Sequence, residues 1–183
     1  MLDEQQGHPA VAATPRMTAW QQAALSLYWF ATSAHWAMLL MILLPLAALA
    51  IGGPAHKGKT LGLILGVGAA VSMIVAPLFG AWSDRVRTRW GRRRPFLVIG
   101  TLGNIAGLVA LAFIPASPRM LVPYMLVFSW LQLTNNFATA PYSALIPDVV
   151  PKAQRGAASG WMGLMTMLGN LVGALSGLLL GAL

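Results

Sequence analysis

The sequence predicts an all-α integral membrane protein, and three observations support that fold class. Of its 183 residues, 57% are hydrophobic and only 9% are charged, whereas soluble domains carry about 25% charged residues. The apolar residues form five long runs, each close to the roughly 20 helical residues that cross a bilayer. Because lipid cannot hydrogen-bond an exposed backbone, we expect every run to be a helix.

The five predicted transmembrane helices cover residues 22–50, 60–82, 96–114, 120–140 and 157–183. Glycine and proline mark the breaks between them, and turns are expected at GGPAHKGKT (52–60) and IPASPR (114–119). Residues 1–21 are mostly polar and predict a disordered cytoplasmic tail. The chain therefore divides into this tail and a transmembrane bundle over 22–183.

Basic residues are distributed unevenly over the two ends of these helices. The far end receives three, Lys57, Lys59 and Arg119. The near end receives nine, which are Arg16, Arg85, Arg87, Arg89, Arg92, Arg93, Arg94, Lys152 and Arg155. Because basic loops stay on the cytoplasmic side during insertion, we expect a cytoplasmic amino terminus in the plasma membrane, with the lipid bilayer as a partner.

The stretch GAWSDRVRTRWGRRRPF, residues 80–96, holds six arginines and one acid, Asp84. A carboxylate at the end of a helix opposes the helix dipole, so Asp84 needs compensation. Nearby arginines or the amino terminus of another helix could supply it, and Gly80 would let that helix approach. The alternative is a loop that only sets topology. A loop this short and held at both ends does not favour a nucleic-acid partner.

The spacing in this stretch carries a family resemblance. The pattern GAWSDR (80–85), five residues, then GRRRPF (91–96) resembles the loop between helices two and three of the major facilitator superfamily. The spacer and the GRRRPF ending are similar to the sucrose–proton symporters and the related glycoside–pentoside–hexuronide–cation symporters. PYSALIPDVVPKAQRGAASG (141–160) resembles the same branch, and the resemblance runs from about Leu25 onwards.

The resemblance implies a secondary active transporter that moves a small solute, most often a sugar, by alternating access between two six-helix bundles. It implies that this chain is an amino-terminal fragment, truncated before helix six, whose partner is the missing carboxyl-terminal half. It also implies a conformational latch made of Gly80, Asp84, Arg85, Gly91, Arg92 and Arg93. No catalytic set, nucleotide loop or metal cluster is recognisable, so we do not expect an enzyme. The alternative is a non-transporting truncated membrane protein or a helix-packing partner.

Polar residues at helical spacing indicate a substrate site. In the first helix, Tyr28, Thr32 and His35 share one face, and Trp29, Ser33 and Trp36 share the next. In the fourth helix, Ser129, Gln132, Asn136 and Thr139 step along one face, with Asn135 beside them. Amides suit sugar hydroxyls and an indole can stack on a sugar ring, so we list as candidates Tyr28, Trp29, Thr32, His35, Trp36, Gln132, Asn135, Asn136 and Thr139. Hydrogen bonding between helices is the alternative for each one.

Glycines spaced by four residues mark the last helix, and they predict close helix packing. They are Gly169, Gly173, Gly177 and Gly181. Weaker versions occur at Gly62 and Gly66 and at Gly103 and Gly107.

The sequence departs from the family pattern in the residues that would couple ion binding to solute transport. Symporters of this branch use carboxylates within the membrane, but the five predicted helices contain no Asp or Glu. A coupling proton or sodium ion is possible, and no other cofactor is expected. Either His35 takes a proton, or coupling lies in the missing half, or the transporter is a uniporter. We expect Asp148 to cap the last helix or to pair with Arg155.

Overall fold

The computed structural model describes residues 16–181, which are almost entirely helical and contain no strand. This confirms the all-α prediction. In chain order the elements are α1 (Ala19–Met38), the π-helical η1 (Leu39–Leu43), α2 (Leu44–Arg85), α3 (Arg94–Phe113), the 3₁₀ turn η2 (Pro118–Met120), α4 (Leu121–Ser143), α5 (Leu145–Val149), the 3₁₀ turn η3 (Lys152–Gln154) and α6 (Arg155–Gly181). Most of the predicted tail, residues 1–15, lies outside the described range.

The start of α2 differs from the predicted turn at 52–60. The backbone is non-helical at one residue, Gly53, with φ 67° and ψ 175°. This φ belongs to the left-handed region that glycine adopts without steric cost. Pro54 then opens the next helical segment, where its missing N–H leaves no hydrogen bond unmade. Residues 44–52 therefore continue from α1 and η1, and the second long helical segment begins at 54 rather than near 60.

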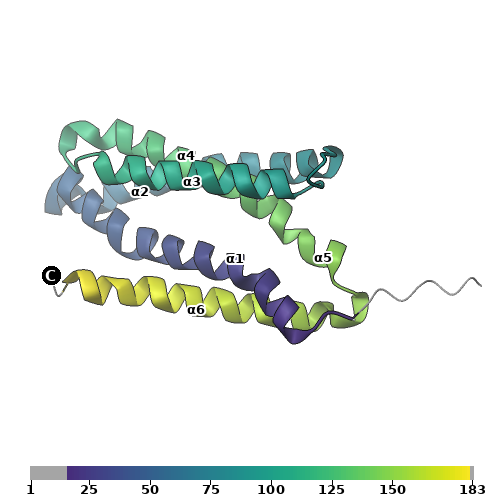
Figure 1. The fold of residues 1–183 in the computed structure, drawn as a ribbon. Helices are drawn as coiled ribbons and strands as arrows, with labels where there is room; N and C mark the ends of the chain where they lie inside the picture. The colour runs from purple at the N-terminus through teal and green to yellow at the C-terminus, as the bar shows by residue number, and fades with distance from the viewer. Residues whose placement is uncertain (1–15, 182–183) are drawn as a thin grey trace, which may run out of the picture.

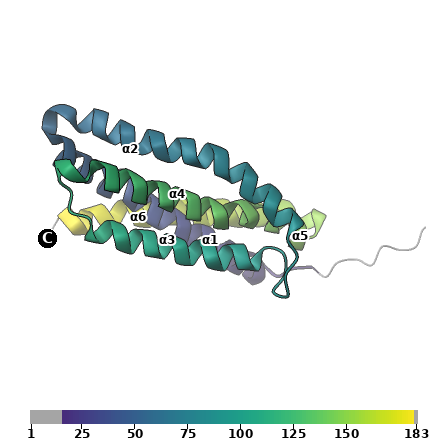
Figure 2. The same ribbon diagram turned by 90° about the horizontal axis from the view of Figure 1, so that it is seen from above.

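The long helices form two groups. Figure 1 shows α2, α3 and α4 in one group and α1 with α6 in the other, and Figure 2 shows α4 between α2 and α3. The contacts agree, because α4 packs against α2 and α3 while α1 packs against α6. The end of the molecule where α2 ends and α3 begins is called the arginine end below.

Glycines bring α6 against α1. A Cβ at Gly169 would overlap the carbonyl oxygen of Phe30, and one at Gly173 would overlap that of Ala34. At Gly177 a Cβ would lie 2.7 Å from Cδ1 of Ile42. Of the four predicted packing glycines, Gly169 and Gly173 therefore face α1, and Gly177 faces η1. Gly181 ends α6, and its contacts lie outside what the structure describes.

Small residues also set the contact of α3 with α4. A Cβ at Gly100 would lie 2.8 Å from the backbone of α4, and Cβ atoms at Gly103 and Gly107 would lie 2.7 Å from side chains of α4. In contrast, no described atom lies within 4 Å of a Cβ built at Gly62 or Gly66. The weaker glycine pattern of α2 therefore faces away from the other described helices.

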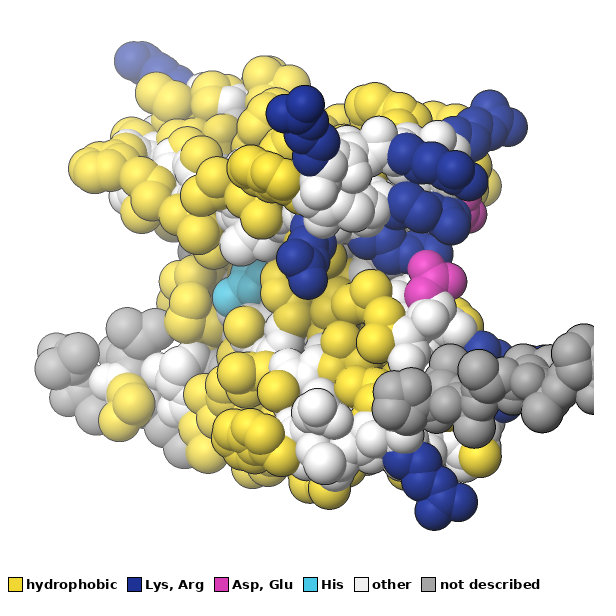
Figure 3. Space-filling model, turned by 45° about the vertical axis from the view of Figure 1, so that its right-hand side comes forward, with side chains coloured by type: hydrophobic (Ala, Val, Ile, Leu, Met, Phe, Trp, Pro, Cys, Tyr) yellow, Lys and Arg dark blue, Asp and Glu magenta, His cyan; other side chains and the backbone are white. Residues whose placement is uncertain are grey.

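The buried apolar core is formed by η1, α2, α3 and α4, with Phe128, Leu131, Leu39, Leu44 and Ile64 fully covered. Much of the outer surface is apolar too, as Figure 3 shows. Two described stretches, Ala19–Arg85 and Arg94–Phe113, have the length and mean hydropathy of membrane spans. Lys and Arg side chains gather at the arginine end in the same view, so polar and apolar surfaces are separated as a bilayer requires.

The start of α1 is fixed at the arginine end. Thr18 caps the helix through a capping box with Gln21. Just before the cap, the side-chain amide of Gln154 accepts from the backbone nitrogen of Met17 and donates to its carbonyl, both at 2.8 Å. These bonds tie the entry of α1 to the turn that precedes α6.

Candidate functional site

A pocket of about 360 Å³ lies where α1, α2, α4 and α6 meet, and we call it the central pocket. Polar uncharged and aromatic side chains dominate its lining, and no charged residue contributes. The lining consists of Trp29, Thr32, Ser33, Trp36 and Leu40 from α1 and η1, Ser72 from α2, Gln132, Asn135, Asn136 and Thr139 from α4, and Asn170 from α6. Such a lining can offer hydrogen bonds but no counter-charge.

The amides in the central pocket are held in fixed orientations. Ser72 donates its hydroxyl hydrogen to Oε1 of Gln132 over 2.9 Å. Asn136 donates from Nδ2 to the Ser72 hydroxyl at 2.9 Å and to the backbone carbonyl of Gln132 at 2.7 Å. This arrangement leaves the amide nitrogen of Gln132 and the amide oxygen of Asn136 available. The pocket therefore offers both a donor and an acceptor from neighbouring turns of α4.

Two tryptophans of the central pocket hold further donors. The indole nitrogens of Trp29 and Trp36 are buried and have no hydrogen-bond partner among the described residues. The Trp36 ring packs edge-on against Phe128 with the ring centroids 6.0 Å apart. A buried donor without a partner is costly, so both indole N–H groups would be stabilised by a hydrogen-bond acceptor.

Most of the predicted substrate residues meet in this pocket. Seven of the nine candidates line it, which are Trp29, Thr32, Trp36, Gln132, Asn135, Asn136 and Thr139. Tyr28 and His35 do not. Ser129, predicted on the same face of α4, donates to the carbonyl of its own helix at Met125 instead.

The candidate list omits four residues of the lining. Ser33 could have been predicted, because it lies on the same helix face as Trp29 and Trp36. Leu40 had no such signal because it is apolar, and Ser72 had none because its neighbours on the same helix face are apolar. Asn170 follows Thr166 by four residues, a polar pair that the prediction overlooked.

Tyr28 and His35 line a second cavity of about 250 Å³ between α1, α3 and α4, which we call the side cavity. Thr32 and Asn135 line both cavities and form the wall between them. On the α3 side, the Tyr28 hydroxyl is hydrogen-bonded to Thr101 at 3.2 Å. The remaining lining residues are Ala31, Asn104, Ile105 and Leu108.

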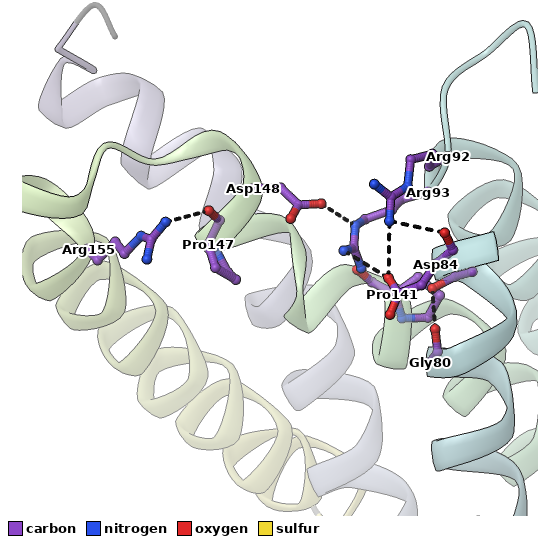
Figure 4. A network of polar contacts seen from close by, with 9 residues as sticks. Gly80, Asp84, Arg92, Arg93, Pro141, Pro147, Asp148 and Arg155 are labelled. Atoms are coloured by element: carbon purple, nitrogen blue, oxygen red, sulfur yellow. Dashed lines mark hydrogen bonds and ion pairs between the residues drawn. The ribbon is translucent and has the colours of Figure 1, made fainter. Parts of the chain in front are cut away.

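A second polar cluster lies at the arginine end and is centred on Arg93 (Figure 4). This side chain is only 7% exposed. Its guanidinium contacts Asp84 Oδ1 at 3.3 Å and Asp148 Oδ2 at 2.8 Å, and it donates to the carbonyl of Pro141 at 2.9 Å. Arg92 adds a 3.4 Å contact to Asp84. Arg93 thus joins the end of α2 to the end of α4 and to α5.

The structure corrects the prediction for Asp148. Its partner is Arg93, and it neither caps α6 nor pairs with Arg155. Arg155 instead donates to the backbone carbonyls of Pro147 at 2.7 Å and Val150 at 3.3 Å. These carbonyls, from the segment before α6, occupy the guanidinium of Arg155. The carboxylate of Asp148 pairs instead with Arg93, at the start of α3.

The predicted latch residues have separate surroundings. No described atom lies within 4 Å of a Cβ built at Gly80, so nothing packs on this glycine. Gly91 adopts φ 93° in the loop, a left-handed conformation that favours glycine. Arg85 is exposed at the end of α2. Asp84 is 56% exposed although it contacts two arginines, so part of its carboxylate can reach a further group.

Comparison with known proteins gives consistent matches. Residues 56–183 match the family described as MFS/sugar transport protein. Sucrose transport protein SUC4 of Arabidopsis thaliana is 28% identical over 156 residues, which cover 78% of this chain and 30% of that protein. Sucrose transport protein SUT5 of Oryza sativa subsp. indica is 28% identical over 162 residues, covering 76% and 30%.

Sucrose transport protein SUC3 of Arabidopsis thaliana is 27% identical over 128 residues, covering 60% of this chain and 22% of that protein. The chain therefore spans less than a third of the length of each of these relatives.

Proposed function

The chain belongs to the MFS/sugar transport protein family, as its arginine motif predicted, and we propose that it is the amino-terminal part of a secondary active sugar transporter. Its similarity to sucrose transport proteins supports a sugar as the solute. Because the chain spans 30% of SUC4, we infer that the second helix bundle lies in a part of the transporter beyond this chain. The solute would bind between the two bundles and reach each side of the membrane in turn.

The central pocket is the observation that carries this proposal. Sugar hydroxyls both donate and accept hydrogen bonds, and the pocket offers the amide nitrogen of Gln132 and the amide oxygen of Asn136. The flat indole of Trp29 or Trp36 can also cover the apolar face of a pyranose. No charged residue lines the pocket, so an uncharged solute fits better than an anionic one.

The motion of the transporter would involve the arginine end. Alternating access requires contacts that form in one state and break in the other. The uncovered Gly80 and the half-exposed Asp84 support a contact with a helix of the second bundle. We propose that this contact stabilises the state closed on the cytoplasmic side, with the amino terminus of the chain in the cytoplasm.

A role as a helix-packing partner has less support. The glycine ridge of α6 would be the surface for such a partner, but Gly169 and Gly173 already pack on α1 of the same chain, and Gly177 packs on η1. The geometry therefore favours the transporter.

The proposal is tested by transport in proteoliposomes that contain the full transporter. Vesicles preloaded with unlabelled sucrose should take up labelled sucrose by exchange. Uncharged sugars should compete, whereas glucuronate should not, because the pocket has no cation to pair with its carboxylate. Absence of exchange with sucrose and with other uncharged sugars would exclude sugar transport.

A further inference from the structure

The side cavity is lined by an ionisable residue, His35, which has no part in the proposed sugar binding. His35 belongs to the side cavity, which is separated from the central pocket by Thr32 and Asn135. Ionisable residues are costly inside a membrane and often mark an ion path.

The hydrogen bonding of His35 identifies its free nitrogen. Nδ1 lies 3.2 Å from the carbonyl oxygen of Ala31. A carbonyl only accepts, so Nδ1 must carry the hydrogen for this contact to be a hydrogen bond. In the neutral ring, Nε2 is then the unprotonated nitrogen with a lone pair. That atom is buried and has no partner among the described residues.

No other group near His35 competes for a proton at neutral pH. Among the described residues, Tyr28 is the only other titratable residue that lines the side cavity, and its hydroxyl is hydrogen-bonded to Thr101 of α3. The other polar lining residues from α1, α3 and α4 are uncharged, namely Thr32, Asn104 and Asn135. The four acids of the sequence lie at positions 3, 4, 84 and 148, all outside the five apolar runs at 22–50, 60–82, 96–114, 120–140 and 157–183.

We propose that His35 is the proton-binding group of the transporter and that it takes the proton at Nε2. This inference rests on the proposed sugar transport. An aqueous proton adds to the Nε2 lone pair, an N–H bond forms, and the neutral ring becomes an imidazolium with one positive charge. The imidazole is the side chain whose charge changes between about pH 5 and 8, so a physiological pH difference can drive this step.

The position of the side cavity explains how the proton and the sugar could be coupled. Protonation turns Nε2 from an acceptor into a donor, and it places a positive charge where no carboxylate lines the cavity. Thr32 and Asn135 line both cavities, so they are the residues through which a change in one cavity would reach the other. A change in the direction of hydrogen bonds on one side of Asn135 alters what its amide can offer to a sugar on the other side.

The transport test separates coupling from sugar movement. His35→Gln keeps a polar side chain of similar size but cannot be charged. We expect this variant to exchange labelled sucrose across proteoliposomes as the wild type does, but to lose sugar accumulation driven by an inward proton gradient. His56→Gln, at an exposed histidine near the start of the second helical segment, is the control and should retain both activities.

Each result of this test decides the proposal. If His35→Gln accumulates sugar as the wild type does, or if the wild type ignores the gradient, His35 is not the coupling group. If even the wild type shows no exchange, the proposed sugar transport is wrong, but this result does not test His35. The protonation of the His35 ring is then measured directly.

That measurement uses the 183-residue chain with ¹⁵N-labelled histidine in lipid nanodiscs. The His35 signals, assigned by their loss in His35→Gln, should show a neutral ring with hydrogen on Nδ1 that gains a proton at Nε2 between about pH 5 and 8. A ring with its hydrogen on Nε2, or one that stays neutral through this range, would overturn the proposal.

Discussion

Ser72 of α2 donates a hydrogen bond to Gln132 of α4 and accepts one from Asn136, each at 2.9 Å. One hydroxyl group therefore orients two amides that belong to different turns of α4. The bonds also cross between two helices that the sequence separates by 60 residues or more. The polar character of the central pocket thus depends on a residue from outside α4.

Removing that hydroxyl should weaken sugar binding. In Ser72→Ala, Gln132 and Asn136 lose their common partner, which costs about 0.5–1.5 kcal/mol. We expect the KM for the sugar to rise roughly two- to tenfold with little change in kcat. Ser129→Ala is the matched control, because this hydroxyl only bonds to the backbone of its own helix. Equal effects of the two substitutions on KM would contradict the assigned role of Ser72.

The buried Arg93 should matter more for stability than its exposed neighbour Arg92. Lysine at position 93 cannot reach Asp84, Asp148 and the Pro141 carbonyl together, because it lacks the planar fork of arginine. We expect Arg93→Lys to lower the free energy of unfolding by about 1–3 kcal/mol, and Arg92→Lys to have a much smaller effect. Thermal unfolding in detergent, followed by circular dichroism, compares them. Equal losses would show that Arg93 does not connect these elements.

The packing of α6 on α1 can be tested in the 183-residue chain. Gly173→Ala places a methyl group against the carbonyl of Ala34 and 2.7 Å from the Cβ of Ala37. We expect a loss of about 1–3 kcal/mol in unfolding free energy from overpacking. Gly163→Ala is the control on the same helix, since no described atom lies within 4 Å of its new methyl group. A Gly163→Ala variant as unstable as Gly173→Ala would contradict this packing.

The charge of Asp84 should matter for the transport cycle. Asp84→Asn keeps the shape of the side chain but removes the charge that would attract the amino terminus of a helix in the second bundle. Loss of about 0.3–2 kcal/mol at this contact shifts a two-state equilibrium several-fold or more. We expect slower cycling and greater cytoplasmic accessibility in the full transporter, measured by uptake and by cysteine labelling.

Two controls accompany the Asp84 test. In the 183-residue chain, insertion into the membrane should be unaffected by Asp84→Asn. Single cysteines at Thr88 and Lys57 should be labelled from the cytoplasmic and the external side, respectively. Unchanged uptake and accessibility in Asp84→Asn would leave the arginine loop with a topogenic role alone.

Helical spacing accounts for what the sequence predicted about the site. Trp29 and Trp36 share one face of α1, and Gln132, Asn136 and Thr139 share one face of α4, because residues three, four or seven apart align on a helix. Those faces were recognisable without knowledge of how the helices pack. The same spacing placed Tyr28 and His35 on the adjacent face of α1, and both were predicted to join the site although they line the cavity towards α3.

Tertiary packing accounts for what the sequence did not predict. Ser72 and Asn170 lie in largely apolar stretches of α2 and α6, and only the packing of these helices brings them to the central pocket. Arg93 and Asp148 are 55 residues apart, and their pairing depends on where α4 ends. GGPAHKGKT contains several turn-forming residues, so the sequence predicted a long turn there. In the structure only Gly53 breaks the helix, and the residues after it are helical.

The central claim is that the central pocket binds the sugar, and equilibrium binding of labelled sucrose to the purified full transporter tests it most directly. We expect Trp36→Ala and Gln132→Ala to weaken binding about tenfold or more, equivalent to about 1.4 kcal/mol, because each removes a group that faces the ligand. Ser129→Ala should bind as the wild type does. Binding of sucrose with unchanged affinity in both pocket variants would place the sugar site elsewhere and contradict the account.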